Sequence, residues 1–486
     1  MGGGAPVLEA PPTYGSGPAG PIGPTGGDAR PPSRSGPPAG WVTAVVALSV
    51  LLVVALVALG LSRRSSDSVA TAPTTTTTPR STTTTPGSGQ TSPSTPTNPG
   101  QTPSTQPGGG TPPSTTAPAS TTGLPDGPAP SAAELQAVVD QLVPFVEQQR
   151  ALAFTTKPAL TLVADADFET RLGQALQPDD AVVTRRAALL QAMTVVANGV
   201  DLVQARTQIL ANETVAFYDP ATKTILMRVR AITPYTSGQV AAELTRALDD
   251  QAVGIARPQY ATEAKELAFT FGAVVLGDAA RVRAAWVASL PSDQQSAYAA
   301  LVDQVHAKSR PQGLNRAIVD LIDGPSTVGL PFVQQLWGTA PDRFGAALTT
   351  PPSSTTQVLH PDRYLSGDEP SEVSPPEAGG DVVDEGVFGE QLTALVLSDS
   401  IEPELARAAA DGWTGDSYVV WKSGGAGMCV SIHYELSSSG EMQELADAYT
   451  TWARSRGGVQ VDDGGGRGTE LEVTSCGGAS SGRSPL

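Results

Sequence analysis

The 486-residue sequence has few of the side chains that hold metals or form redox centres. It contains two cysteines, Cys429 and Cys476, and three histidines, His306, His360 and His433. The cysteines form no C-x-x-C pair, and no two histidines share the spacing of one helical turn. These absences argue against a zinc ribbon, a thioredoxin-like redox motif and a metal site built on paired histidines.

Basic and aromatic residues are also scarce. Lys and Arg number 30 against 48 Asp and Glu, which gives a formal net charge of -18, and aromatic residues make up 5% of the chain. The excess of negative charge lies after residue 130, since residues 1–130 hold five basic and four acidic side chains. A nucleic-acid backbone binds clustered Lys and Arg, so no nucleic-acid partner is expected.

Glycine and proline are abundant, and they concentrate before residue 130. Residues 1–40 have almost no large apolar side chains and are expected to form a disordered tail. Residues 41–61 carry no charge, and as a helix they would rise about 31 Å, enough to cross the hydrocarbon layer. The run starts late for a signal peptide and is followed by Arg63 and Arg64, which favours a retained transmembrane helix.

Residues 62–130 are rich in Ser, Thr and Pro and are predicted to form a disordered stalk. Arginines flank the transmembrane segment on both sides and leave its orientation open. The stalk favours a cytoplasmic N-terminus and a C-terminal part outside the cell membrane. Cys429 and Cys476 are therefore expected to form one disulfide, with two buried free thiols as the alternative.

Residues 131–476 are predicted to have an α+β fold. A mainly helical domain with a small β-hairpin is expected over 131–380, a small α+β lobe over 381–476 and a disordered tail over 477–486. Ser131, with Glu134 three residues later, is typical of a capping box at a helix start. Apolar spacing predicts further helices at 165–176, 181–198, 237–252, 259–288, 291–309, 389–397, 403–410 and 440–456, and strands at 159–163, 215–218, 223–229, 418–421, 429–434 and 470–474.

Five segments carry a distinctive pattern in their order along the chain. They are Ala216–Pro220, Val240–Gln251, Val274–Ala279, Pro351–Leu365 and Gly412–Asp416, with Gly389-Glu390 before the last. Over roughly residues 131–476 this set resembles a family of bacterial exported zinc metallopeptidases of the gluzincin type. That family has a G-F-Y-D-P hairpin, an H-E-x-T-H helix, an E-G-D-A helix, a P-P-x-S-T-E-Q-V-L-H-P-E-K-Y segment and a G-W-x-G-D turn.

The chain departs from this resemblance at the metal ligands. The two zinc histidines correspond to Ala242 and Arg246, and the third ligand, a glutamate, corresponds to Leu276. Alanine and leucine offer no lone pair and arginine stays protonated, so no metal or other cofactor is expected there. Glu243 keeps the position of the general base. We predict that Arg246, three residues along the helix, pairs with Glu243 in place of the lost zinc.

Four further residues lie in the matching segments. Asp250 and Asp278 correspond to acidic positions behind the ligands and are expected to be structural. His360 and Tyr364 belong to a loop near the cleft, where His360 either contacts a peptide carbonyl or anchors the loop together with Tyr364.

The resemblance and its departures together imply a membrane-anchored pseudo-metallopeptidase without catalytic residues. The expected role is to bind a peptide, a protein or a cell-wall component. An active peptidase with an unconventional site and a purely structural envelope protein are the alternatives.

Overall fold

The computed structural model describes residues 123–262, 266–310, 315–424 and 427–477. The predicted N-terminal tail, the transmembrane segment and nearly all of the stalk lie outside these residues. No helix within them is both long and apolar enough to cross a membrane. The folded part begins earlier than the predicted start at Ser131, because Leu124 is 1% exposed and the Gly123 carbonyl accepts a hydrogen bond from the Gln304 side chain.

The first helices surround a small sheet. Helix α2 (Ala132–Arg150) has the predicted capping box, in which Ser131 Oγ accepts from the Glu134 amide and the Glu134 carboxylate accepts from the Ser131 amide. The elements that follow are β1 (Ala159–Val163), α3 (Asp165–Leu176), η1 (Gln177–Asp179), α4 (Asp180–Ala192) and α5 (Leu202–Glu213).

The predicted hairpin joins β1 in a three-stranded sheet of order β1-β3-β2. β2 (Ala216–Asp219) pairs antiparallel with β3 (Thr224–Arg228), which pairs parallel with β1. The Asp219 carboxylate accepts from the Ala221 amide and the Thr222 hydroxyl and so fixes the turn. β2 therefore lies at the edge of the sheet, where helix α6 packs against it.

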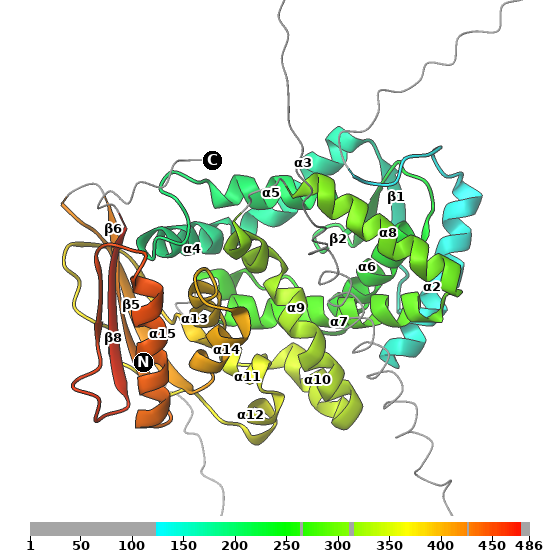
Figure 1. Cartoon of the computed structure of the whole chain (residues 1–486). Coiled ribbons are helices and arrows are strands. Elements are labelled where there is room, and N and C mark those ends of the chain that lie inside the picture. The colour runs from blue at the N-terminus through cyan, green and yellow to red at the C-terminus, as the bar shows by residue number, and fades with distance from the viewer. Residues whose placement is uncertain (1–122, 263–265, 311–314, 425–426, 478–486) are drawn as a thin grey trace, which may run out of the picture. The chain divides into compact units, whose positions relative to one another are not determined.

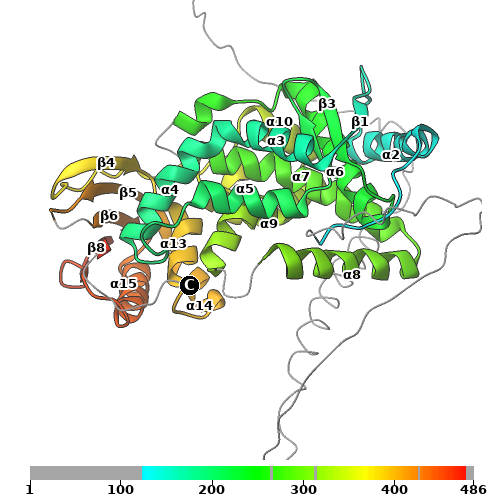
Figure 2. The ribbon, with the colours of Figure 1, turned by 90° about the horizontal axis from the view of Figure 1, so that it is seen from above.

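A helical layer follows the hairpin and fills the middle of the described part (Figures 1 and 2). α7 packs against both α6 and α9, and its closest approach to α9 is at Gly277 and Gly329. The elements of this layer are α6 (Pro234–Val253), η2 (Pro258–Thr262), α7 (Leu267–Ser289), α8 (Ser292–Ser309), α9 (Arg316–Thr339), α10 (Pro341–Thr349), α11 (Thr355–Leu359) and α12 (Pro361–Ser366).

The C-terminal lobe is built on a five-stranded antiparallel sheet of order β4-β5-β6-β8-β7. It lies at one end of the described part, with the cyan helix α2 at the other (Figure 1). Its elements are β4 (Asp381–Gly386), α13 (Gly389–Leu397), α14 (Pro403–Ala410), β5 (Trp413–Lys422), β6 (Met428–Leu436), α15 (Ser439–Ala453), β7 (Val459–Asp462) and β8 (Glu470–Gly477).

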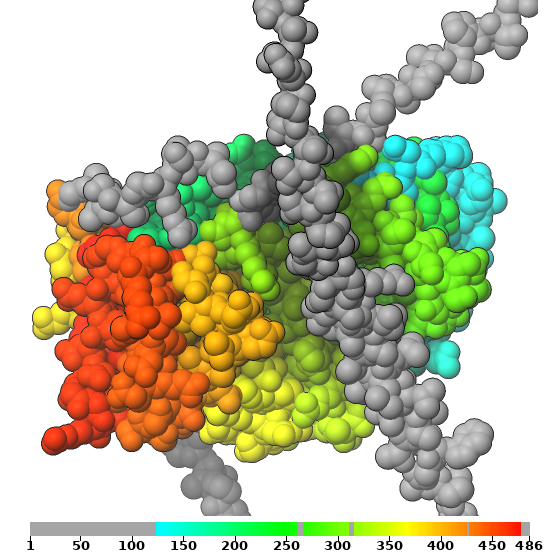
Figure 3. All heavy atoms as spheres, viewed as in Figure 1, coloured from blue at the N-terminus to red at the C-terminus, as the bar shows by residue number. Residues whose placement is uncertain are grey.

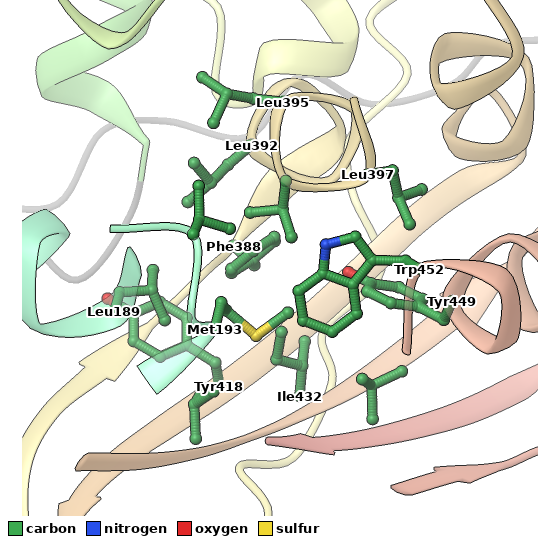
Figure 4. Packing of buried hydrophobic residues seen from close by; sticks show 14 of the residues in the cluster. Leu189, Met193, Phe388, Leu392, Leu395, Leu397, Tyr418, Ile432, Tyr449 and Trp452 are labelled. Carbon is green, nitrogen blue, oxygen red and sulfur yellow. The ribbon is translucent and has the colours of Figure 1, made fainter. Parts of the chain in front are cut away.

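The lobe shares its hydrophobic core with a helix from the first half of the chain. Leu189 and Met193, at the end of α4, are completely buried among Phe388, Ile432 and Trp452 of the lobe (Figure 4). On the face shown in Figure 3, the gold, orange and red residues of the lobe lie beside the yellow and green residues that precede them in the chain. Residues 131–380 and 381–476 thus meet through one continuous core.

Some element boundaries differ from the sequence-based expectation. The helix expected over 181–198 ends at Ala192, and Thr194 adopts a φ of 56° that no helix continues through. The single helix expected over 259–288 is a short 3-10 turn followed by α7. Helix α9 was not predicted, because its two internal prolines, Pro325 and Pro331, are residues that normally end a helix.

Candidate functional site

Helix α6 carries the segment that resembles a metallopeptidase helix. It starts sharply, since Thr233 and Thr236 form a reciprocal cap and Pro234 occupies the first turn. β2 lies along one side of α6 and α7 along another, so most of its side chains are buried. This packing holds Glu243 and Arg246 beside the edge of the small sheet.

The Glu243 carboxylate is occupied by two donors. Its Oε2 accepts from the Tyr218 backbone N–H at 2.7 Å and from Arg246 Nη1 at 2.8 Å. The side chains are 14% exposed for Glu243 and 24% for Arg246, so water reaches the pair only in part. The predicted pairing of Arg246 with Glu243 is confirmed.

The three positions that the resemblance assigns to zinc ligands contain no metal-binding atom. Ala242 is buried on α6, Leu276 is half-buried on α7, and Arg246 donates to Glu243. A catalytic zinc site needs three protein ligands with nitrogen, oxygen or sulfur lone pairs. The residues present therefore do not fit a zinc ion at this place.

Asp250 ties α6 to the hairpin. Its carboxylate accepts from the Tyr218 hydroxyl at 2.6 Å, from Lys223 Nζ at 2.5 Å and from the Ile255 amide at 3.0 Å. Burial raises the pKa of Asp250, but the hydrogen bonds from Lys223 and Tyr218 outweigh it and leave the pKa below its usual value. Asp250 is thus an ionised anchor for the turn.

Asp278 belongs to a buried network of four charges. Arg150 of α2 lies 2.5 Å from Asp249 of α6 and 2.6 Å from Asp278 of α7, and Arg281 lies 2.8 Å from Asp278. Burial and the neighbouring Asp278 raise the pKa of Asp249 above its usual value, while Arg150 opposes this. Two arginines face two aspartates, so the network joins three helices through side chains of opposite charge. The pairing of Asp278 with Arg150, which Asp278 shares with Asp249, was not anticipated, because these residues come from three different helices.

His360 lies at the junction of α11 and α12 and faces two carboxylates. Its Nε2 is 2.7 Å from Glu390 Oε1 and 3.1 Å from Asp411 Oδ1. The hydrogen bond with Glu390 raises the pKa of His360 although burial lowers it. Tyr364 serves as the anchor instead: its hydroxyl donates to the Thr350 carbonyl, and its ring packs edge-on against Phe332.

Glu390 is positioned by a second buried carboxylate. Asp416 accepts from the amides of Phe388 and Gly389 at 2.6 and 2.7 Å, and from the Trp413 indole N–H at 2.6 Å. These bonds fix the start of α13, where Gly389 has a φ of +81°.

Two of the motif segments meet at His360, and a third lies behind Glu390. The P-P-x-S-T segment supplies His360, Gly389-Glu390 supplies the buried carboxylate, and the G-W-x-G-D turn supplies Asp416 and directly follows Asp411. The sequence-based interpretation missed the pairing of His360 with Glu390 and Asp411. The usable signal was that Glu390 lies within one such segment and Asp411 next to another.

The two cysteines form a disulfide, as predicted. Cys429 of β6 and Cys476 of β8 are direct partners in the sheet register. They lie on the sheet face opposite Val430 and Ile432, which belong to the shared core. The bond therefore joins two central strands of the lobe.

Comparison with known proteins gives a match for the lobe only. Residues 377–480 match the model of a domain of unknown function (DUF8575). No curated protein and no solved structure matches the chain. The match begins close to the predicted boundary at residue 381 and includes Glu390, Asp411, Cys429 and Cys476, whereas the helices that carry His360 and Glu243 precede it.

Proposed function

We propose that this protein is a non-catalytic relative of the zinc metallopeptidases. It is anchored in the cell membrane by residues 41–61, with the domain that follows the stalk outside the membrane. Its role is to bind a peptide, a protein or a cell-wall component.

The occupied carboxylate of Glu243 is the observation that carries this proposal. A general base in a metallopeptidase acts on a water polarised by the metal. Here Arg246 supplies the positive charge, but a guanidinium has no open coordination position at which a water could be activated. Glu243 also accepts a hydrogen bond from the Tyr218 amide at the edge of β2. A peptide strand that paired with this edge would therefore first have to displace Glu243.

A hollow on the lobe favours a binding role over a purely structural one. It has a volume of about 540 Å³ and lies over β6 and β8. Its one histidine, His433, is 3.2 Å from Glu472. An acidic hollow of this kind suits a partner that presents Lys or Arg side chains. Five acidic residues line it: Glu372, Glu435, Asp462, Glu470 and Glu472.

The absence of catalysis is tested by incubating the full-length protein with unfolded protein substrates, with and without added zinc. We expect no cleavage above the background of a Glu243→Gln variant. Cleavage that a chelator blocks and that Glu243→Gln abolishes would show an active peptidase and refute the proposal.

The metallopeptidase-like scaffold is tested by restoring the ligands. We expect the triple variant Ala242→His, Arg246→His, Leu276→Glu to bind one additional zinc ion per chain, because α6 and α7 pack against each other. The matched control is Ala242→His with Leu276→Glu alone, which lacks one ligand and should bind zinc at least about ten-fold more weakly. No added zinc in the triple variant would mean that the three positions do not face a common point.

A further inference from the structure

We infer that His360, Glu390 and Asp411 form a binding site for one divalent transition-metal ion, Zn²⁺ or Mn²⁺. The site is separate from the lost ligand positions on α6 and α7. Each residue offers one ligand atom, and the three atoms lie within 4.8 Å of one another.

The geometry is close to that of a metal-ligand set. His360 Nε2 lies 2.7 Å from Glu390 Oε1 and 3.1 Å from Asp411 Oδ1. Around a tetrahedral ion with bonds of about 2.0 Å, neighbouring ligand atoms are about 3.3 Å apart. To reach this spacing, His360 Nε2 must move about 0.6 Å away from Glu390 Oε1 and about 0.2 Å away from Asp411 Oδ1, and the ion would replace the proton on Nε2.

A buried oxygen of Glu390 without a hydrogen-bond partner is an independent indication that a cation binds here. Glu390 is only 4% exposed, and its Oε2 is buried and accepts no hydrogen bond within the described part of the chain. A buried carboxylate with an unpaired oxygen is costly. The nearby buried carboxylate of Asp416, by contrast, has hydrogen-bond donors for both of its oxygens, since it accepts from three N–H groups. A cation beside Glu390 would provide the missing partner.

Each of the three proposed ligands lies at the end of a helix. His360 is held between α11 and α12, since its amide donates to the Thr356 carbonyl and its carbonyl accepts from the Arg363 amide. Glu390 sits in the first turn of α13, and Asp411 directly follows α14. The backbone of each ligand is thus held in place before an ion binds, which favours a preorganised site.

Exposure and charge also suit an ion that enters from water. Glu390 forms the buried base of the site, while the His360 side chain is 33% exposed and that of Asp411 is 60% exposed. Two carboxylates face the ion. The nearby Arg363 opposes them, but its Nη1 donates to the Trp413 carbonyl.

The donor set selects the class of ion. One imidazole nitrogen with two carboxylate oxygens is compatible with Zn²⁺ and with Mn²⁺, whereas Mg²⁺ and Ca²⁺ prefer oxygen alone. Glu390 and Asp411 lie within the segment that matches the domain of unknown function, and His360 lies before it. A bound ion would therefore bridge the lobe and the helices that precede it.

The test uses the full-length untagged protein, stripped with a chelator and titrated with Zn²⁺ and Mn²⁺ by calorimetry and thermal melting. We expect one ion per chain, a higher melting temperature with the ion, and a shift of one imidazole signal among three histidines in NMR spectra. His360→Gln and Glu390→Gln should each weaken binding at least about ten-fold. His306→Gln, which changes an exposed histidine on α8, is the matched control and should bind as the wild type does.

Two results would overturn the inference: no saturable binding of either ion, or equal binding by His360→Gln and the wild type. Circular dichroism must show that the His360→Gln and Glu390→Gln variants are folded. If one of them does not fold, the other still tests the site. The outcome is also distinguishable from the proposed function. An ion that His360→Gln removes belongs to this site, whether or not the protein cleaves substrates. Cleavage supported by a second zinc ion, which His360→Gln does not remove, would argue against the non-catalytic role and leave this inference standing.

Discussion

At the scale of single residues, Glu243 and Arg246 show how a carboxylate is kept in a half-buried place without a metal. The guanidinium and the Tyr218 amide both donate to the same oxygen. Replacing Arg246 with Met keeps most of the side-chain volume but leaves Glu243 with one donor. We expect Arg246→Met to lower the free energy of unfolding by about 1–2 kcal/mol in urea titrations, because partial exposure softens the penalty of a buried unpaired charge.

A matched pair of the same spacing is available on the surface. Arg407 and Glu404 are also three residues apart on a helix, but their side chains are 59% and 79% exposed. Arg407→Met should therefore change stability by less than about 0.5 kcal/mol. Adding Glu243→Gln to Arg246→Met should recover part of the loss. Equal effects of Arg246→Met and Arg407→Met would show that the Glu243 pair is not coupled to the fold.

Glu266 makes stability depend on pH. It is fully buried beside Gly389 and accepts from the Thr355 amide, and burial raises its pKa from 4.5 to about 8. Asp416 adds to this shift and Arg186 opposes it. Because the folded state binds the extra proton between these two values, this contribution to stability is complete below about pH 4.5 and is lost as the pH rises toward 8.

We expect Glu266→Gln to remove this dependence. Relative to the variant, the wild type should lose up to about 5 kcal/mol between pH 4.5 and 8, at about 1.36 kcal/mol for each pH unit. The measurement is the difference between the two urea-unfolding free energies at several pH values, which cancels the titration of Asp416. A difference that stays flat, or that grows in the wild type's favour as the pH rises, would contradict a neutral Glu266.

Residue-level contacts were predictable from the sequence only where they are local. Glu243 and Arg246 are three residues apart on one helix, so helical geometry alone brings them together. His360, Glu390 and Asp411 are 30 and 21 residues apart, and only the packing of three helix ends joins them. The same holds for Arg150, whose partner Asp249 is 99 residues away.

At the scale of elements, α7 and α9 depend on two glycines at their crossing. A methyl group on Gly329 would lie 1.9 Å from the Ala273 carbonyl oxygen, and one on Gly277 would lie 2.4 Å from the Gly329 backbone. Both neighbours are backbone atoms that cannot rotate away. We expect Gly329→Ala to lower the free energy of unfolding by about 3 kcal/mol or more, measured by urea titration.

Gly345 provides the control for this prediction. It lies inside α10, is exposed, and an added Cβ would meet no atom within 4 Å. Gly345→Ala should therefore stabilise the protein by up to about 1 kcal/mol, as alanine does in a helix. If Gly329→Ala behaved in the same way, α7 and α9 would not approach each other as closely as the structure places them.

Elements with a clear apolar period were predicted well, and those shaped by tertiary contacts were not. The capping box of α2, the hairpin and helices α13 and α14 follow from local sequence. Helix α9 continues through its two prolines because α7, α10 and α11 pack around it and stabilise the helical backbone. The short edge strand β7 has only four residues and is set by its pairing with β8.

At the scale of the whole molecule, the shared core decides whether the lobe is independent. The segment that matches a domain of unknown function begins at residue 377, yet Leu189 and Met193 of α4 are completely buried in its core. Ser475 of β8 also donates to the Ala192 carbonyl at the end of α4. Unfolding the lobe alone would expose these apolar side chains of α4 to water, at roughly 2–3 kcal/mol for each large one.

We therefore expect the helical part and the lobe to unfold in a single transition. Trp286 reports on the helical part, and Trp413 and Trp452 report on the lobe. Full-length variants that retain one of these three tryptophans and none of the other five in the chain should give coincident urea midpoints by fluorescence, equal to the midpoint from circular dichroism. Met193→Asp should lower the midpoints of both probes together, because it places a charge in the core that both parts build. Two separated midpoints, with Met193→Asp shifting the lobe probe alone, would show that the lobe folds by itself and that α4 only rests against it.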